Sequence, residues 1–158
     1  LMNERKQHET AETQAKTAAM TSEEASQQAE QPKDDADKLL FRRVSATIMS
    51  KKMFLQPKLS REDVINEVYV PHNKFAQLFT RYAGMSFTKF VNELRLEYAA
   101  QLLLDRPDYT IEAIGEACGM PIAQTFYRNF SDKFGVTPSD FRILSQKNAE
   151  KSAQNEEM

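Results

Sequence analysis

Two segments of this chain share one plan, and one predicted helix stands between them. Residues 60–79 and 110–130 each contain a short helix with one apolar face, a tight turn, and a second helix whose outer face is polar. The intervening residues, 86–104, carry apolar side chains at three- and four-residue spacing and predict a single long helix. Such a helix would hold the two segments at a fixed distance, which suits a ligand that is periodic along its length.

The same periodicity predicts an all-α fold of seven helices, since no stretch alternates as a strand would. The first helix is expected to begin near Asp37, the second to cover 61–68, and the third to begin at Pro71 or His72. The fourth is expected to cover 86–104 and the fifth to begin after a Thr110 cap. The sixth is expected to cover 122–133 and the seventh to begin at Thr137-Pro138. The first helix is expected to bury Leu40, Phe41, Val44, Ile48 and Met49, and the last is expected to bury Phe141, Ile143 and Leu144.

Each repeated segment fits a helix-turn-helix unit. Such a unit needs a first helix that is apolar on one face, a short turn, and a second helix that keeps a polar, reachable face. The first turn is Tyr69-Val70-Pro71, where Tyr69 replaces the usual glycine. The second turn contains Gly119, which tolerates positive φ. One match is weak evidence because any three-helix bundle can imitate it, but two joined by one helix are much stronger.

The whole-chain net charge of −2 includes a basic central part, residues 39–145, which we call the body. Residues 1–38 carry five Lys/Arg and nine Asp/Glu, residues 39–145 carry fourteen and eleven, and residues 146–158 carry two and three. The body therefore has a net charge of +3, which permits phosphate binding without arguing strongly for it.

The two ends of the chain are predicted to be disordered. Residues 1–36 contain no aromatic side chain and almost no large aliphatic one, so they bury too little apolar surface to offset the entropy of ordering. We therefore expect a polar linker over 1–36 that is disordered or marginally helical, and a disordered tail over 146–158.

Several function classes find no support in the sequence. No apolar run is long enough to span a bilayer, and the N-terminus does not resemble a signal peptide. Cys118 is the only cysteine and is expected to be a small core residue, while His8 and His72 have no partners at metal-ligand spacing. Without a catalytic constellation, the prediction is a cytoplasmic protein that is not an enzyme and binds no metal or cofactor.

Residues 60–144 resemble the DNA-binding domain of the AraC/XylS family of bacterial transcription regulators, over just over half of the chain. The matching motifs are Gly84-Met85-Ser86-Phe87, Arg95-Leu96-Glu97-Tyr98-Ala99, Ile111-Glu112-Ala113-Ile114-Gly115, Phe126-Tyr127-Arg128-Asn129-Phe130, and the run from Phe134-Gly135-Val136-Thr137-Pro138 to Ser139-Asp140-Phe141-Arg142. The last run is a distinctive marker of the family.

The resemblance implies a domain over 37–145 with two helix-turn-helix subdomains, about 37–85 and 105–145, joined by the linker helix 86–104. Its function would be sequence-specific binding of double-stranded DNA, as the output domain of a bacterial transcription regulator. Each subdomain would place a recognition helix in a major groove, with the two grooves about 34 Å apart. A helical protein-interaction module that never binds DNA is the alternative, and the modest charge of the body supports it.

Residue roles carry over by position from the resemblance. The base-contact candidates are His72, Asn73, Ala76, Gln77, Ala123, Gln124, Thr125 and Arg128. Gln77 stands where relatives often have arginine, which predicts a preference for adenine over guanine. The phosphate-contact candidates are Thr80, Arg81, Lys89, Ser131 and Lys133, together with the backbone N–H groups that open the helices at Ser60 and Thr110.

Roles other than DNA contact remain open for some of these residues. Arg128 has Asp132 four positions on as an ion-pair partner, and His72 and Gln77 could simply be solvated. Arg95 is expected to pair with an acidic neighbour on the linker helix rather than touch DNA.

The resemblance also implies partners beyond DNA. Family members usually carry a separate sensing or dimerising domain, which this chain is expected to lack, and RNA polymerase is a further candidate partner. Without that domain, the chain is expected to be monomeric or weakly dimeric.

Overall fold

The computed structural model describes residues 33–156, and every regular element in that range is helical. Residues 33–50 form the first helix. The elements that follow are the 3-10 helix η1 (Met53–Leu55), α2 (Arg61–Val68), α3 (His72–Tyr82), α4 (Phe87–Asp105), α5 (Ile111–Ala117), α6 (Ala123–Phe134) and α7 (Pro138–Glu156). The predicted all-α fold of two helix-turn-helix units joined by a long helix is confirmed.

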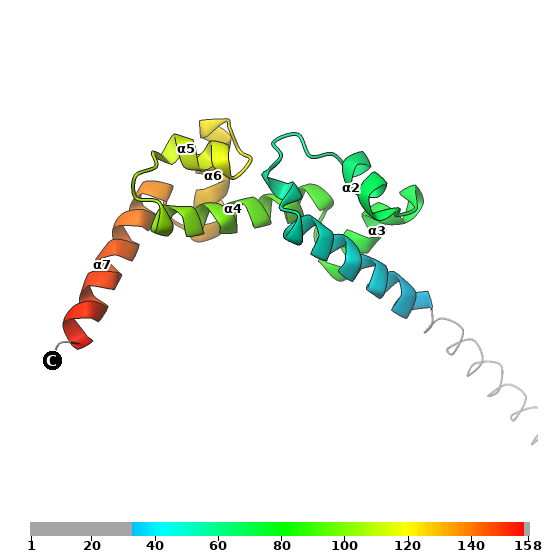
Figure 1. Ribbon diagram of the computed structural model, residues 1–158, viewed down its shortest axis with the longest axis horizontal. Coiled ribbons are helices and arrows are strands. Elements are labelled where there is room, and N and C mark those ends of the chain that lie inside the picture. Colours follow the sequence, from blue (N-terminus) through cyan, green and yellow to red (C-terminus); the bar gives the residue numbers. More distant parts are fainter. Residues whose placement is uncertain (1–32, 157–158) are drawn as a thin grey trace, which may run out of the picture. The chain divides into compact units, whose positions relative to one another are not determined.

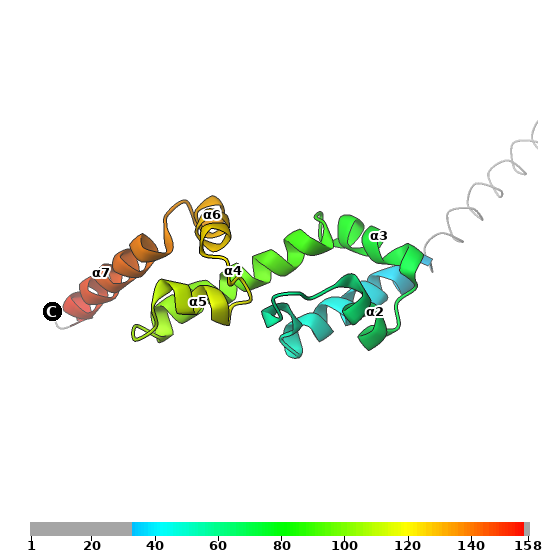
Figure 2. The same ribbon diagram turned by 90° about the horizontal axis from the view of Figure 1, so that it is seen from above.

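Helix α4 is shared by two groups of helices within residues 41–156. Figure 1 shows α2 and α3 gathered at the N-terminal half of α4, while α5 and the start of α7 lie at its C-terminal half and α6 lies nearer its middle. The same grouping is visible from above in Figure 2. Helix α4 contacts η1, α3, α5, α6 and α7. We call the two groups the first and second lobes.

Phenylalanine rings form much of the first lobe's core. Phe75 and Phe79 from α3 are fully buried, with ring centroids 5.1 Å apart. Phe87 at the start of α4 lies edge-on to both, at 5.0 Å and 5.3 Å. Burying one such ring stabilises the fold by roughly 1.5–3 kcal/mol, so these contacts fix α3 against α4.

The second lobe has its own apolar core. Its buried members are Leu96, Ala99, Leu103, Ile114, Cys118, Met120, Phe126 and Phe130. Gly115 lets α5 and α6 approach closely, because a Cβ there would lie 3.0 Å from the Met120 carbonyl oxygen and 3.1 Å from the Phe126 ring. Phe126 and Phe130 anchor α6 and leave its opposite face exposed.

Both turns adopt left-handed backbone. Tyr69 has φ 58° and an 86% exposed side chain, and Gly119 has φ 92°. Gly119 also lies against the η1 segment, where a Cβ would be 2.9 Å from the Phe54 carbonyl oxygen. The second turn therefore requires glycine for its conformation and for its packing. The first accommodates tyrosine because its φ lies in the small left-handed region open to other residues, and its exposed side chain needs no room in the core.

The helical region extends past both of its predicted ends. Residues 33–36, at the end of the expected linker, are helical, and the rest of that linker lies outside the described residues. Helix α7 continues through Glu156 rather than ending near 145. Both additions consist of alanine, lysine, glutamate, glutamine and other residues that helices tolerate, with no glycine or proline to end them.

Three predicted core residues are half exposed: Met49 at 50%, Ile143 at 48% and Leu144 at 50%. Val44 and Ile48 are fully buried, and Phe41 and Phe141 are partly buried. Met49 follows Ile48 on the helix and lies about 100° further round it, off the buried side. Ile143 and Leu144 lie on sides of α7 that no described element covers.

The predicted pairing of Arg95 with an acidic neighbour was also wrong. Arg95 is 9% exposed, and its guanidinium donates to the carbonyl oxygens of Phe54 and Gln56, each at 2.6 Å. A third bond, of 3.0 Å, reaches the Asn92 Oδ1. The segment after η1 turns its carbonyl groups toward α4, and arginine's planar array of donors suits several acceptors at once.

Candidate nucleic-acid interface

Helix α3 presents one polar, exposed face. It begins directly after Pro71, whose fixed φ suits a helix entry, and its apolar residues Phe75, Leu78 and Phe79 turn inward. The four base-contact candidates on this helix are exposed: His72, Asn73, Ala76 and Gln77. His72 Nδ1 lies 3.5 Å from the Glu62 carboxylate on α2.

Helix α6 presents the matching face of the second lobe. Ala123, Gln124 and Arg128 are exposed, and Thr125 is partly buried. The structure contains no ion pair between Arg128 and Asp132 within the described residues, so the plainer role weighed for Arg128 is not adopted. Gln124 and Arg128 are one turn apart on the same side of α6, which places both on one exposed strip.

Ile122 is exposed at the start of α6 and was not among the predicted contacts. It is the N-cap residue of α6, makes no side-chain capping bond, and is 66% exposed. The prediction placed residue 122 inside the helix rather than at its cap. The available signal was an apolar residue at a helix start, where Ser, Thr, Asp or Asn is usual.

At the two helix starts proposed to bind phosphate through backbone N–H groups, the side chains of Ser60 and Thr110 cap the helices. The Ser60 hydroxyl accepts a bond from the Asp63 amide, and the Asp63 carboxylate accepts from the Ser60 amide at 2.8 Å. These bonds to Ser60 hold the pKa of Asp63 below its usual value, so a negative charge stays at the start of α2. Thr110 caps α5 by accepting from the Ala113 amide at 3.1 Å.

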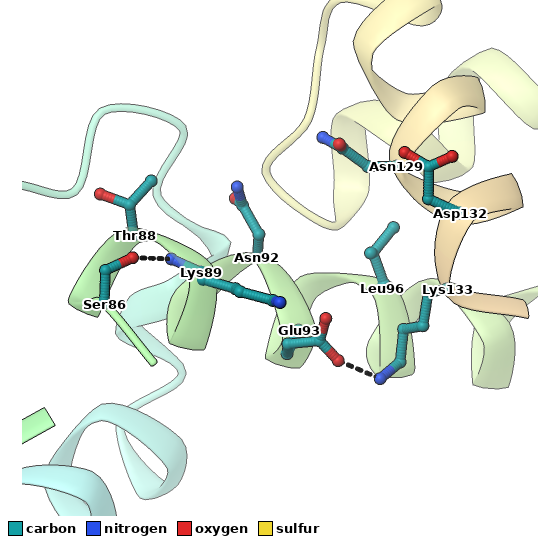
Figure 3. Close-up of a pocket in the computed structure, with 9 residues that line it drawn as sticks. All are labelled: Ser86, Thr88, Lys89, Asn92, Glu93, Leu96, Asn129, Asp132 and Lys133. Atoms are coloured by element: carbon teal, nitrogen blue, oxygen red, sulfur yellow. Dashed lines mark hydrogen bonds and ion pairs between the residues drawn. The ribbon is translucent and has the colours of Figure 1, made fainter. Parts of the chain in front are cut away.

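Lys133 lies in a cleft between α4 and α6 rather than on the open surface. Its ammonium group forms an ion pair with Glu93 and lies 3.8 Å from the Glu97 carboxylate. Figure 3 shows this pair at one end of a cleft of about 430 Å³, with Asn92 and Asn129 on its walls. A lysine that already faces two carboxylates is a weaker phosphate ligand than its position in the sequence indicates.

The other phosphate candidates lie on the surface or near it. Lys89 is exposed and lines the same cleft, and Arg81 is exposed at the end of α3, with its guanidinium 5.6 Å from the Tyr82 ring centroid. Thr80 is exposed and donates its hydroxyl to the Ala76 carbonyl oxygen at 3.0 Å. Ser131 is partly buried on α6.

The length of α4 sets the scale of the whole surface. Its 19 residues correspond to about 28 Å at 1.5 Å per residue. That length is of the same order as the roughly 34 Å between successive major grooves on one side of duplex DNA. A connecting helix of this length is compatible with two binding units that follow the repeat of a DNA helix.

The described residues offer little for other chemistry. No group of three or more His, Cys, Asp or Glu residues between 33 and 156 is placed to hold a metal ion. In the same range, no helix combines the length and the apolar character needed to cross a membrane.

Known proteins with this arrangement are helix-turn-helix regulators. A family model described as "Helix-turn-helix domain" matches residues 65–143, half of the chain. The regulatory protein PocR of Salmonella typhimurium is 32% identical over 95 residues, covering 60% of this chain and 31% of PocR. This chain spans about a third of the length of the curated relatives it matches.

Two solved structures show the same fold. A transcriptional regulator from Chromobacterium violaceum, titled as an AraC-type DNA-binding domain-containing protein, has a TM-score of 0.59 at 26% identity, over 69% of this chain and 94% of that one. The DNA-binding domain of AdpA, solved with a target DNA, has a TM-score of 0.60 at 18% identity, over 68% and 94%. The fold and its two exposed helices define a double helix-turn-helix domain. The chain belongs to the AraC-type family of helix-turn-helix transcription regulators.

Proposed function

We propose that this chain binds double-stranded DNA sequence-specifically, with α3 and α6 in successive major grooves. The observation that carries the proposal is the pair of exposed polar helix faces, on α3 and α6, that both belong to helices packed on α4. Each face belongs to the second helix of a helix-turn-helix unit, which is the helix that enters the groove in this motif. The AdpA domain, which shares the fold, was solved in complex with a target DNA.

The proposed base contacts divide between the two helices. His72, Asn73, Ala76 and Gln77 face the first groove, and Ala123, Gln124, Thr125 and Arg128 face the second. Arg128 suits the bidentate contact to guanine, whereas Gln77 suits adenine. Arg81 and Lys89 are the favoured phosphate contacts, because both are exposed and charged.

The chain is proposed to act as the output part of a longer bacterial regulator in the cytoplasm. It covers only about a third of its relatives, so a sensing or dimerising domain would occupy the remainder. The DNA-binding domain would extend over about 37–145, with RNA polymerase as a partner at the promoter. The relatives' names describe transcription regulators and not enzymes.

Selection from a random duplex library tests the proposal. Two short enriched motifs about 10 base pairs apart are expected, because half-sites on one side of DNA repeat with the helical turn. A library without any enriched motif would contradict sequence-specific binding. If a partner protein rather than DNA were the ligand, titration with a mixed-sequence duplex would also show no binding at low salt.

A further inference from the structure

We infer that Arg95 is a positioning residue that locks the two lobes in one relative orientation, so that tertiary contacts as well as α4 set the spacing between half-sites. The inference about the lobes stands on geometry alone, and its consequence for half-site spacing rests on the proposed function. A single α-helix between two lobes fixes their distance but resists twisting and bending only modestly. A contact that joins both lobes to the middle of α4 removes that freedom.

The first side of the lock is the segment that includes η1. Arg95 holds it through the carbonyl oxygens of Phe54 and Gln56, at 2.6 Å each. The segment is tied to the first lobe at its start, where Lys51 forms an ion pair with Glu67 of α2. The ring of Phe54 also lies edge-on to Tyr98 of α4, with centroids 5.9 Å apart. Residues 51–56 therefore connect the first lobe to the centre of α4.

The second side of the lock is the turn between α5 and α6. A Cβ on Gly119 would lie 2.9 Å from Arg95 Nε, 2.9 Å from the Phe54 carbonyl oxygen and 3.0 Å from the Leu55 carbonyl oxygen. The turn of the second helix-turn-helix unit thus rests directly on the arginine and on the segment that the arginine holds. A glycine at this position is needed because any side chain would separate the two lobes.

The chemistry of Arg95 makes this contact hard to replace. Its guanidinium is buried, and all three of its hydrogen bonds go to neutral acceptors, two of them backbone carbonyl groups. Arginine can satisfy these acceptors together because its donors are fixed in one plane, whereas lysine presents one compact ammonium group. Arg95→Lys therefore keeps the charge but cannot hold both carbonyl oxygens in the same geometry.

The chain provides a matched control in Arg142. This arginine on α7, like Arg95, makes three hydrogen bonds to neutral acceptors: the backbone carbonyl oxygens of Leu103, Tyr109 and Arg106, at 3.2, 3.0 and 3.1 Å. All of its partners belong to the second lobe. Arg142→Lys therefore removes the same kind of contact without touching the junction between the lobes.

The direct test measures the distance between the lobes without DNA. Spin labels on Asn66→Cys in α2 and Glu116→Cys in α5 report it by pulsed electron spin resonance, since both positions are exposed and Cys118 is buried. The parent and Arg142→Lys proteins should give one narrow distance distribution, and Arg95→Lys should give a broad one. Arg95→Met, which keeps an apolar stem, repeats the test if the lysine variant does not fold. A narrow distribution in a folded Arg95 variant, or a broad one in the parent, would overturn the inference.

The consequence for DNA is tested with half-sites at altered spacing. The two lobes act as linked binding modules, so a rigid connection favours one spacing and disfavours the rest. Arg95→Lys should weaken binding about fivefold at the best spacing and flatten the penalty for one or two inserted base pairs, with isolated half-sites bound as before. An unchanged spacing penalty would contradict this step. Absence of binding by every variant would instead count against the proposed function, and the spin-label result would still stand.

Discussion

Individual side chains on α3 and α6 carry the recognition proposed for this domain, and their exposure separates them from the core. Arg128 and Gln124 form one exposed strip, while Phe126 and Phe130 on the opposite side are fully buried. Substitutions on the exposed strip should therefore change binding without changing stability. Surface substitutions of this kind usually alter the free energy of unfolding by less than about 0.5 kcal/mol.

Arg128→Ala should relax preference at one base position of the selected site. A bidentate arginine contact discriminates against the wrong base by roughly 1–3 kcal/mol, and alanine makes no such contact. Competition binding with a set of single-base variants of the site measures the effect. Lys151→Ala, which removes a charge from the exposed end of α7, is the control and should leave every position unchanged. Equal loss on all sequences would show that Arg128 binds phosphate.

Ile122 should read a thymine methyl group at the second half-site. Its exposed side chain lies at the start of α6, where recognition helices approach base edges, and apolar side chains contact the thymine C5-methyl. Replacing that thymine by uracil should weaken parent binding by about 0.8 kcal/mol, the value of one buried methyl-sized group. The same replacement should have no effect on Ile122→Ala. Equal uracil effects in the two proteins would rule out the contact.

Cys118 should make stability fall at high pH. Burial raises the pKa of its thiol from an ordinary 9.0 to about 11 in the folded chain. The unfolded thiol then ionises first, so the unfolded state binds fewer protons and the free energy of unfolding decreases between about pH 9 and 11. The loss should approach roughly 2–3 kcal/mol over this window. Urea unfolding across the window should show a shallower decline for Cys118→Ala, and parallel declines would contradict the assignment.

At the scale of elements, α7 has two parts with different roles. Its first turns pack on the second lobe through Phe141 and the three bonds of Arg142, whereas residues 146–156 are exposed throughout. The distal part is helical because its residues favour helix and not because it packs on another element. Its helicity therefore contributes little to the stability of the domain.

Deleting residues 147–158 should leave stability almost unchanged. We expect a change in the free energy of unfolding within about 0.5 kcal/mol, because only exposed side chains are removed from the described part of the chain. The circular dichroism signal at 222 nm should nevertheless fall as helical residues are lost. Arg142→Ala, in contrast, should destabilise by about 1–3 kcal/mol because three carbonyl groups, two of them in part-buried bonds, lose their donors. Urea unfolding measures the stability of the deletion and of Arg142→Ala. A large fall in the free energy of unfolding on deletion would show that the distal part packs on the domain.

The sequence predicted elements better than it predicted contacts between them. The bounds of α2, α4 and α6 came within a residue or so of the structure because helical periodicity and caps such as Ser60 and Ser86 are local signals. The role of Arg95 was missed because its acceptors lie 39 and 41 residues away. The exposure of Ile143 and Leu144 was missed for a similar reason, since a periodic apolar face does not reveal whether another element covers it.

In the proposed site, too, the sequence predicted local features but not contacts between distant residues. The exposed faces of α3 and α6 follow from periodicity, and all their predicted residues except Thr125 are exposed. The ion pair of Lys133 depends on α6 lying beside Glu93 of α4, forty residues earlier, which no local pattern indicates. Whether the exposed residues contact bases stays a prediction that the binding experiments above test.

At the scale of the whole molecule, the modest charge should give DNA binding a shallow salt dependence. Residues 39–145 carry a net charge of +3, and the Lys133 ammonium already faces two carboxylates. The slope of log K against log salt is about −0.9 for each phosphate neutralised, so we expect a value between about −3 and −5. Titration at salt concentrations from 50 to 200 mM measures it. Lys89→Ala should reduce the magnitude of this slope by about 0.9, whereas Lys133→Ala should leave the slope unchanged. The reverse result would show that Lys133, and not Lys89, contacts a phosphate.

The buried junction at Arg95 and Gly119 also bears on how a protein of this kind can acquire new targets. The residues that would choose bases are exposed, so they can change one at a time with little effect on folding. The residues that fix the angle between the lobes are packed against one another, and altering one leaves its neighbours without partners. Base preference can therefore drift step by step, while the separation of the half-sites is inherited as a unit. Descendants of such a protein should differ in the base sequences of their half-sites long before they differ in the spacing between those half-sites.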